Sequence, residues 1–424
     1  MSTALVVGNM IGSGVFLLPA SLAAFGGISL VGWLLTSTGA VLLASIFARL
    51  SRMVPQVGGP YAYTRRGFGD FAGFLVGWGY WISIWAGNAA IAIAFVGYLA
   101  VFWPALESSP VLAVGVALGA IWLLTWVNAA GIRKAGAVQL VTTILKLVPL
   151  VVIGTLGLVY IRLGNFTPFN VSSGSSFSAI TASAALTLWA FLGLESATVP
   201  AEDVEHPNRT IPRATMLGTV LTAAVYILGS VAVMGVLPPA ALADSTAPFA
   251  DAASEMWGSW ASYAVAAGAA ISCFGALNGW ILLQGQMPLA AARDRLFPAP
   301  FSRVSRRHTP VTGLVVSSVL ITVLMAMNYT RGLVEQFTFI VLLATLASLL
   351  PYLLSSLAAL LIGRQWSWRV HVVAVLAFLY SAWAIAGAGQ EVVYWGSLLL
   401  MAGVPVYVWA KWRRPSQPGD SPVR

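Results

Sequence analysis

The stretch GNMIGSG, residues 8–14, interrupts an apolar run over residues 1–24 that is otherwise long enough to cross a bilayer. It is poor helix material, because glycine costs about 1 kcal/mol relative to alanine and serine competes for backbone hydrogen bonds. Unpaired backbone groups survive at membrane depth only inside protein or beside a ligand. The stretch therefore predicts a first helix that is unwound in mid-membrane and presents its amides and the Ser13 hydroxyl to a solute. The alternative is a close helix–helix contact, for which Gly8 and Gly12 have the spacing.

The composition indicates a membrane protein. Of the 424 residues 59% are hydrophobic and 8% are charged, and the mean hydropathy is +0.86. Soluble proteins carry about 25% charged residues. The single Cys273 excludes an intrachain disulfide framework and a multi-cysteine metal site. We therefore predict an all-α polytopic protein that crosses the membrane many times.

The chain divides into twelve apolar segments, counted at about 20 residues per span. They lie near residues 2–24, 29–50, 70–102, 110–130, 136–161, 179–200, 214–237, 258–288, 311–328, 333–362, 369–388 and 392–411. No connection is long enough for a separate soluble domain, so residues 1–424 are expected to form one transmembrane domain. The connections on one side hold most of the basic residues, whereas the opposite side holds only Arg162 and Arg331. This asymmetry predicts that both termini are cytoplasmic.

Two ionisable residues lie well inside the expected spans. Lys146 lies in the fifth span and Glu195 in the sixth. A charge at the bilayer centre costs about 2.5–3.5 kcal/mol on insertion scales. The functional interpretation is a proton-coupling site or a gate, and the alternative is a buried polar contact that holds helices together.

The sixth span repeats the interruption of the first. Gly193 lies in mid-span just before Glu195 and Ser196. Interrupted helices five spans apart are typical of two inverted five-helix repeats with a binding site between them. Half-helix N-termini suit a carboxylate and freed carbonyls suit an ammonium group, so an amino acid would fit. We expect repeats over about 1–161 and 179–362, two peripheral helices over 369–411, and a tail over 415–424.

Several motifs resemble those of one transporter superfamily. The match begins with GNMIGSGVFLLPA at residues 8–20 and GGPYAY at 58–63, and continues through WAGN at 85–88, Glu195-Ser196 and NGW at 278–280. The chain resembles the amino acid–polyamine–organocation superfamily, and within it the basic amino acid/polyamine antiporters of the arginine/agmatine type. The resemblance implies a LeuT-like fold of ten helices in two inverted repeats plus two peripheral helices, and in many members a homodimer.

The resemblance also implies a role for each candidate site residue. Ser13, Gly14 and the adjacent backbone would receive the substrate carboxylate, and the backbone near Met10 and Trp189 would receive the amino group. Trp189 would also lie over the substrate as a gate.

Three further roles follow from the same resemblance. Trp280 and Asn88 would meet the distal end of the substrate, and Glu195 matches an acid assigned to proton sensing. An indole face holds a cation by about 0.5–2 kcal/mol, which is weak enough for release. Without the resemblance, each tryptophan would be read as a packing or interfacial residue and Asn88 as a contact between helices.

Lys146 departs from the arginine/agmatine pattern and resembles the lysine of proton-coupled permeases in the same superfamily. Burial and a nearby cation both lower a lysine pKa, so Lys146 could release and regain a proton as the site opens to each side. This residue keeps a second function open, namely proton-coupled uptake of small neutral amino acids.

The sequence thus predicts a secondary transporter in the inner or plasma membrane that exchanges amino acids or their amine products by alternating access. An enzyme would need several convergent acids, histidines or a nucleophile at membrane depth, where this sequence has only Lys146 and Glu195. We expect no cofactor, no metal site and no nucleic-acid partner. The expected partners are a small amino acid or amine, protons and the lipid bilayer.

Overall fold

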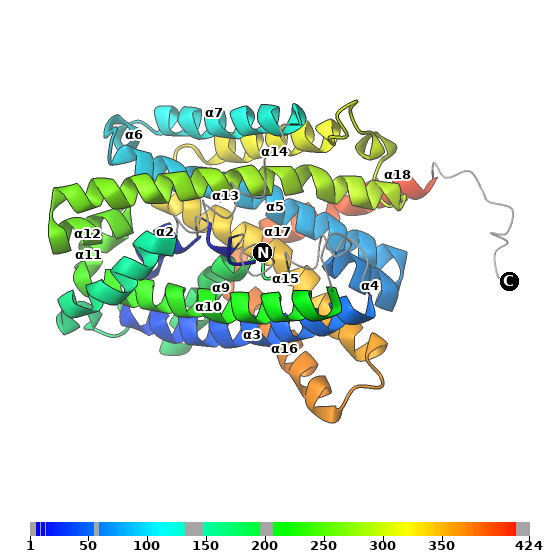
Figure 1. The fold of residues 1–424 in the computed structure, drawn as a ribbon, viewed down its shortest axis with the longest axis horizontal. Coiled ribbons are helices and arrows are strands. Elements are labelled where there is room, and N and C mark those ends of the chain that lie inside the picture. The colour runs from blue at the N-terminus through cyan, green and yellow to red at the C-terminus, as the bar shows by residue number, and fades with distance from the viewer. Residues whose placement is uncertain are drawn as a thin grey trace, which may run out of the picture.

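A computed structural model describes residues 6–8, 10–12, 14–54, 59–131, 147–195 and 207–412. Within these ranges every regular element is a helix. The long helices run roughly along one direction and form a bundle, with short helices at its ends (Figure 1). This confirms the all-α, multi-span class that the composition predicts.

In the described part of the chain, nine helices are long and apolar enough to cross a membrane. They lie close to the segments expected from the sequence. Their bounds are η1 with α3 (Gly26–Ile28 and Ser29–Met53), α5 (Asp70–Ala100), α7 (Pro110–Ala129), α10 (Pro207–Val236), α13 (Ser259–Arg293), α14 (Val311–Asn328), α15 (Leu333–Ile362), α16 (Trp368–Gly387), and α17 with α18 (Gln390–Met401 and Gly403–Trp412).

Three shorter apolar helices occupy the places of the first, fifth and sixth expected spans. They are α2 (Gly14–Ala23), the helix Leu147–Tyr160 that ends in η2 (Gly157–Tyr160), and α9 (Ser176–Leu188) with η4 (Trp189–Phe191). The first two of them directly follow residues outside the described ranges, Ser13 and Lys146.

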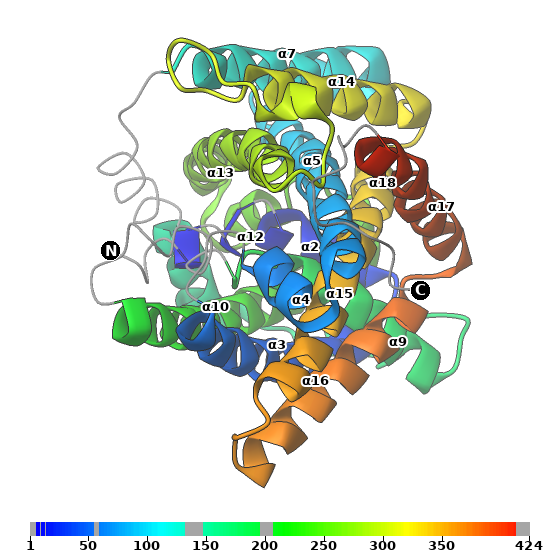
Figure 2. The same ribbon diagram turned by 90° about the vertical axis from the view of Figure 1, so that its right-hand side faces the viewer.

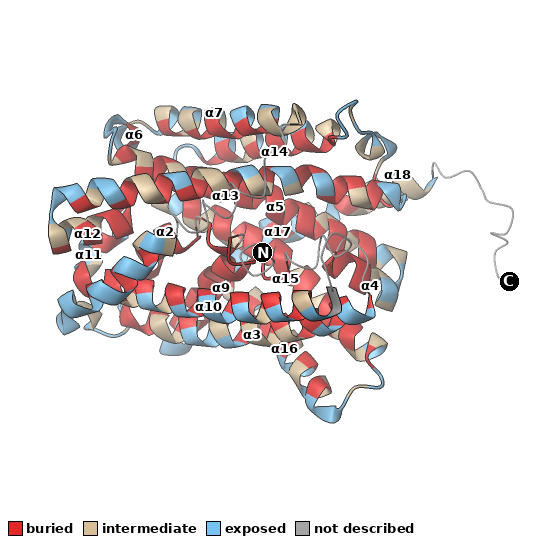
Figure 3. Ribbon diagram, in the orientation of Figure 1, coloured by how far each residue is buried: buried red, intermediate tan, exposed pale blue. Residues whose placement is uncertain are grey.

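Helix α5 forms the centre of the bundle and packs along α13 and α15 (Figure 2). In the most apolar 18-residue stretch of α5, 89% of the residues are buried, whereas the corresponding share for the helix pair α17–α18 is 17%. Small residues make this close packing possible: a Cβ at Gly79 would lie 3.0 Å from the backbone oxygen of Ala347 on α15. The buried residues are concentrated in the middle of the bundle, and the exposed ones lie on its outer helices (Figure 3).

The other long helices surround this centre. Helix α3 packs against α9 and α10, α7 lies beside α14, and α16 crosses outside α3 and α15. The last expected span, 392–411, is divided in two at Ala402. The reason is local, since the carbonyl of Leu399 accepts the indole N–H of Trp78 at 2.8 Å, and Gly403 lies directly against that indole.

Short helices cover the two ends of the bundle. Several begin with proline, which suits the first helical turn because its amide needs no partner there. The short helices are α4 (Pro60–Phe68), α6 (Ala105–Ser108), η3 (Leu163–Phe166), α11 (Pro239–Ala243), α12 (Pro248–Trp257) and η7 (Ala299–Ser302).

Candidate functional site

The first span is interrupted where the sequence predicts it. Ile11 and Gly12 form a bend, and α2 begins only at Gly14. The amide of Gly12 reaches back to the carbonyl of Met10 at 2.9 Å, a tight turn in place of a helical bond. The phenol of Tyr226, on α10, donates to the same Met10 carbonyl at 2.6 Å. A buried side chain therefore satisfies one of the backbone groups that the break exposes.

The helix of the sixth expected span also ends early. Helix α9 ends at Leu188, a single 3₁₀ turn follows over Trp189–Phe191, and Leu192 is extended. Gly193 has φ +99°, a backbone conformation that glycine adopts without steric cost. The turn at Gly193 delivers Glu195 to the interior of the bundle, where its side chain is fully buried.

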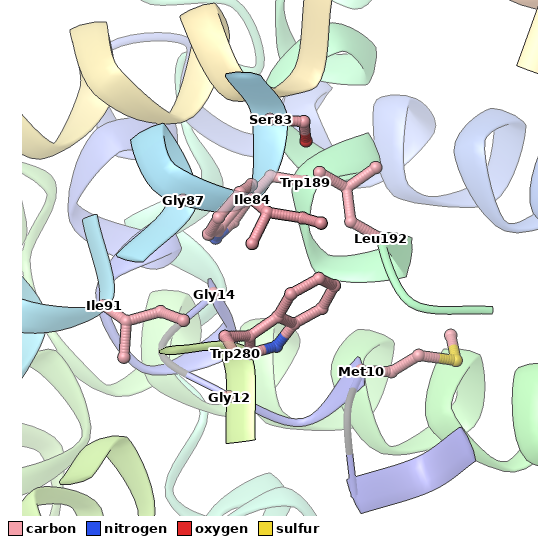
Figure 4. A pocket seen from close by; sticks show the side chains of 10 residues that line it. All are labelled: Met10, Gly12, Gly14, Ser83, Ile84, Gly87, Ile91, Trp189, Leu192 and Trp280. Carbon is pink, nitrogen blue, oxygen red and sulfur yellow. The ribbon is translucent and has the colours of Figure 1, made fainter. Parts of the chain in front are cut away.

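A narrow cavity of about 20 Å³ lies between the two interruptions. Met10, Gly12 and Gly14 line it from the first span, Trp189 and Leu192 from the sixth, and Trp280 from α13. Helix α5 supplies a further wall made of Ser83, Ile84, Gly87 and Ile91. Both tryptophan side chains reach into this space from different elements (Figure 4). This volume holds about one water molecule, so the surrounding side chains nearly fill the space between the two interruptions.

Two glycines determine where the Trp189 indole lies. A Cβ at Gly14 would stand 2.9 Å from Cδ1 and Nε1 of the indole, and a Cβ at Gly87 would stand 2.7 Å from Cη2. The ring is therefore held between α2 and α5 at sites where no larger residue fits. Trp189 itself is 8% exposed.

Glu195 does not line the cavity but lies at a buried junction beside it. The phenol of Tyr80, on α5, donates to one carboxylate oxygen at 2.8 Å, and the phenol of Tyr352, on α15, donates to the other at 2.7 Å. All three side chains are at most 5% exposed. The carboxylate thus connects the interrupted sixth span to two long helices, and its protonation would change both contacts.

Asn88 is fully buried and is not among the lining residues. Its Nδ2 donates to Oε1 of Gln284, on α13, at 2.7 Å. Gln284 in turn donates from Nε2 to the carbonyl of Leu314 and to the hydroxyl of Ser318. Asn88 therefore belongs to a polar network between α5, α13 and α14.

A charged cluster joins α4 to the ends of three long helices. Asp294 accepts from Tyr61 at 2.8 Å and from Arg65 at 2.9 Å, and Asp70 accepts from Arg65 at 3.0 Å and from Lys411 at 2.9 Å. Burial, together with the Asp294 carboxylate, raises the pKa of Tyr61. This phenol stays protonated and continues to donate its hydrogen bond at physiological pH.

Of the predicted site residues, Met10, Gly14, Trp189 and Trp280 lie around one cavity. Ser13 and Lys146 lie outside the described residues. Over the ranges that the structure describes, no three His, Cys, Asp or Glu side chains come together as metal ligands.

Sequence reasoning assigned no role to three residues that organise the site, namely Tyr226, Gln284 and Tyr352. A mid-span glutamine one helical turn after Trp280 was the one available signal. The two tyrosines carried no comparable signal, because tyrosine is common in membrane helices and their partners are more than 150 residues away.

A profile of amino acid permeases matches residues 1–407. The chain belongs to the amino acid permease family. This permease is 34% identical to the putrescine transporter PotE of Haemophilus influenzae over 415 residues, 96% of this chain and 94% of the relative. It is 38% identical to the cadaverine/lysine antiporter of Escherichia coli K12 over 359 residues, 83% of this chain and 80% of the relative. The resemblance to the amino acid–polyamine–organocation superfamily is thereby confirmed.

The permease also shares its fold with a solved structure. A crystal structure of a manganese transporter from Eremococcus coleocola superposes with a TM-score of 0.63 at 14% identity, covering 97% of this chain and 93% of that one. Identity at this level supports the shared fold alone.

Proposed function

We propose that this permease is a secondary exchanger that swaps a cationic amino acid for its decarboxylated amine across the inner membrane. The observation that carries the proposal is the cavity between two interrupted helices with the Trp189 and Trp280 indoles on its wall. The names of the two relatives, for putrescine and for cadaverine/lysine, favour polyamine-type antiport. Arginine with agmatine is a further pair of the same chemistry.

The chemistry of the cavity suits such solutes. The interrupted backbone near Met10 and Gly14 offers carbonyl and amide groups to an amino acid's ammonium and carboxylate. The indole faces of Trp189 and Trp280 attract a cationic distal group. The described lining residues include no carboxylate. A weakly held cation is released readily, as exchange requires.

The proposed arrangement in the membrane has twelve spans and cytoplasmic termini. The nine long helices and the three shorter apolar ones together supply twelve candidates. In this arrangement the first and sixth spans are interrupted because they begin two inverted repeats, over about 1–161 and 179–362. Two peripheral helices over 369–411 and a tail over 415–424 lie outside the repeats. Alternating access then proceeds by movement around these two helices, without ATP or covalent chemistry.

Glu195 is the proposed proton-responsive group. Its carboxylate accepts from Tyr80 and Tyr352 at once, so protonation weakens its contacts with both helices. The alternative function, proton-coupled uptake of small neutral amino acids, depends on Lys146, which lies outside the described residues.

Counterflow in proteoliposomes tests the proposal. Vesicles are loaded with unlabelled lysine, cadaverine, ornithine, putrescine, arginine, agmatine or alanine, and entry of each labelled solute is measured with and without a pH gradient. We expect amino acid and amine to exchange one for the other without a gradient. Uptake of alanine alone, driven by the pH gradient, would contradict the proposal and support the alternative.

A further inference from the structure

The Asn88–Gln284 pair has a fixed polarity. The hydrogen bond from Asn88 Nδ2 to Gln284 Oε1 is 2.7 Å long, and both residues are fully buried. Gln284 Nε2 donates to the Leu314 carbonyl at 3.2 Å and to the Ser318 hydroxyl at 2.9 Å. The Gln284 amide therefore uses its oxygen toward α5 and its nitrogen toward α14.

The Leu314 carbonyl dictates this orientation. A backbone carbonyl only accepts hydrogen bonds, so the amide group that faces it must be the nitrogen of Gln284. The oxygen of Gln284 then faces Asn88, which must donate to it from its amide nitrogen. An exchange of nitrogen and oxygen in either side chain would oppose two acceptors or two donors. The backbone carbonyl of Leu314 on α14 therefore fixes the direction of the hydrogen bonds that link Leu314, Gln284 and Asn88.

One acceptor is left over at the end of this chain. Asn88 Oδ1 is buried and has no hydrogen-bond partner among the described residues. Native proteins pair nearly all such groups, so an orphaned one at a candidate site calls for a ligand or a water molecule. Since the orphan is an oxygen, the missing partner must be a donor.

The orphan lies next to the cavity. Asn88 follows Gly87 on α5 and shares a helical face with Ile84 and Ile91, which all line the cavity. Gln284 lies one turn beyond Trp280 on α13. The polar pair therefore adjoins the same part of the wall as the Trp280 indole.

We propose that Gln284 is a positioning residue that turns the Asn88 carbonyl oxygen toward the substrate and so selects solutes whose distal end donates hydrogen bonds. The class is primary amines and other N–H donors, and solutes with an apolar or carboxylate end are disfavoured. This inference rests on the proposed function, and it adds a residue through which the site distinguishes its substrates.

Pairs of ligands that differ only in the distal amine test the proposal. Binding of lysine is compared with norleucine, and cadaverine with pentylamine, by titration calorimetry on the purified protein. We expect the wild type to favour the amine member of each pair. Gln284→Met removes the acceptor that holds the Asn88 amide and should lower this preference about tenfold, with the affinity for norleucine changed by less than about threefold.

Two further variants make the test specific. Gln284→Glu, measured at acid pH so that its carboxyl is protonated, offers the same acceptor to Asn88 and a donor to Leu314, and should retain most of the preference. Gln336→Met is the matched control, because Gln336 is a buried glutamine on α15 whose nitrogen faces the carbonyl of Met325 instead. It should leave the preference unchanged.

The outcomes separate this inference from the proposed function. If the wild type binds neither lysine nor cadaverine, the proposed function fails and the inference with it. If the wild type binds both members of each pair equally, or if folded Gln284→Met keeps the full preference, the inference alone is overturned. Should Gln284→Met not fold, Gln284→Leu, which removes the same acceptor from Asn88, gives the answer by the same ratio.

Discussion

The indole of Trp189 lies so close to Gly87 that a Cβ at that position would stand 2.7 Å from its Cη2 atom. Trp189 belongs to the interrupted sixth span and Gly87 to the central helix α5. The absence of one side chain on α5 thus defines where an aromatic residue 102 positions away can lie. The shape of the cavity depends on this contact, because Gly87 and Trp189 both line it.

Gly87→Ala should weaken substrate binding. Alanine favours the helical state of α5 by about 1 kcal/mol, but its methyl group displaces the indole from its position. We expect a loss of affinity of about tenfold or more for lysine and cadaverine alike, measured by titration calorimetry. Gly115→Ala on α7, where nothing lies within 4 Å, is the control. Unchanged affinity in Gly87→Ala would show that the indole position does not matter.

Trp280→Ala should weaken binding of long cationic solutes more than binding of alanine. The reason is the lost attraction between the indole face and a distal cation, worth about 0.5–2 kcal/mol, or about 2- to 30-fold in affinity. Trp260→Ala, on the same helix but 69% exposed, should have little effect. Equal losses for lysine and alanine would remove Trp280 from the distal end of the site.

Tyr226→Phe should lower both stability and substrate affinity. It removes one of the two donors to the Met10 carbonyl and leaves only the Gly12 amide, and a buried hydrogen bond contributes about 0.5–1.5 kcal/mol. Thermal unfolding with and without substrate measures both effects. Tyr263→Phe, whose tyrosine is 52% exposed on α13, serves as the reference. A melting temperature equal to that of the reference variant would mean that the interrupted segment does not need this hydrogen bond.

Glu195→Gln should reduce the pH dependence of exchange. A carboxamide resembles the protonated acid, so the variant at neutral pH should behave like the wild type at acid pH. Counterflow rates between pH 5 and pH 8 measure this. Glu335→Gln, which changes a 67% exposed carboxylate side chain on α15, is the control. A wild-type profile in Glu195→Gln would reduce Glu195 to a structural contact.

Asp251→Asn, on the short helix α12, should stabilise the protein at alkaline pH. Burial raises the pKa of the Asp251 carboxyl, and the neighbouring Glu107 adds to the effect. The folded protein therefore holds this proton more tightly than the unfolded chain, and stability is lost as pH rises through the raised pKa. Asparagine still accepts the hydrogen bond from Ser245. The melting temperature of Asp251→Asn should exceed that of the wild type at pH 8 and equal it in acid. Asp244→Asn, which changes an exposed carboxylate, is the control and should show no such pH-dependent gain.

Local sequence was sufficient to predict both interruptions. Gly12 and Gly193 lie inside long apolar runs, and a break in such a run has few physical explanations. The grouping of Trp189 and Trp280 around one cavity came from the family resemblance, since nothing in the spacing of two tryptophans 91 residues apart requires it.

The partners of the candidate residues could not be read from the sequence. The expected contact of Asn88 with the solute stays a prediction, and the sequence did not indicate that its amide nitrogen pairs with Gln284, 196 positions along the chain. Tyr226 and Met10 are 216 positions apart. Such pairs depend on how the helices pack, and one sequence carries no record of that packing.

The Tyr226 phenol gives the interrupted first span a property beyond rigidity. It occupies one lone pair of the Met10 carbonyl and the Gly12 amide takes the other, so an arriving ammonium group would gain that oxygen by displacing the phenol. Substrate binding would then break the hydrogen bond between α10 and the first span, and substrate release would let it form again. The Met10 carbonyl would exchange the Tyr226 donor for a substrate donor. The substrate-free and substrate-bound forms of the protein would therefore differ in whether α10 is hydrogen-bonded to the first span.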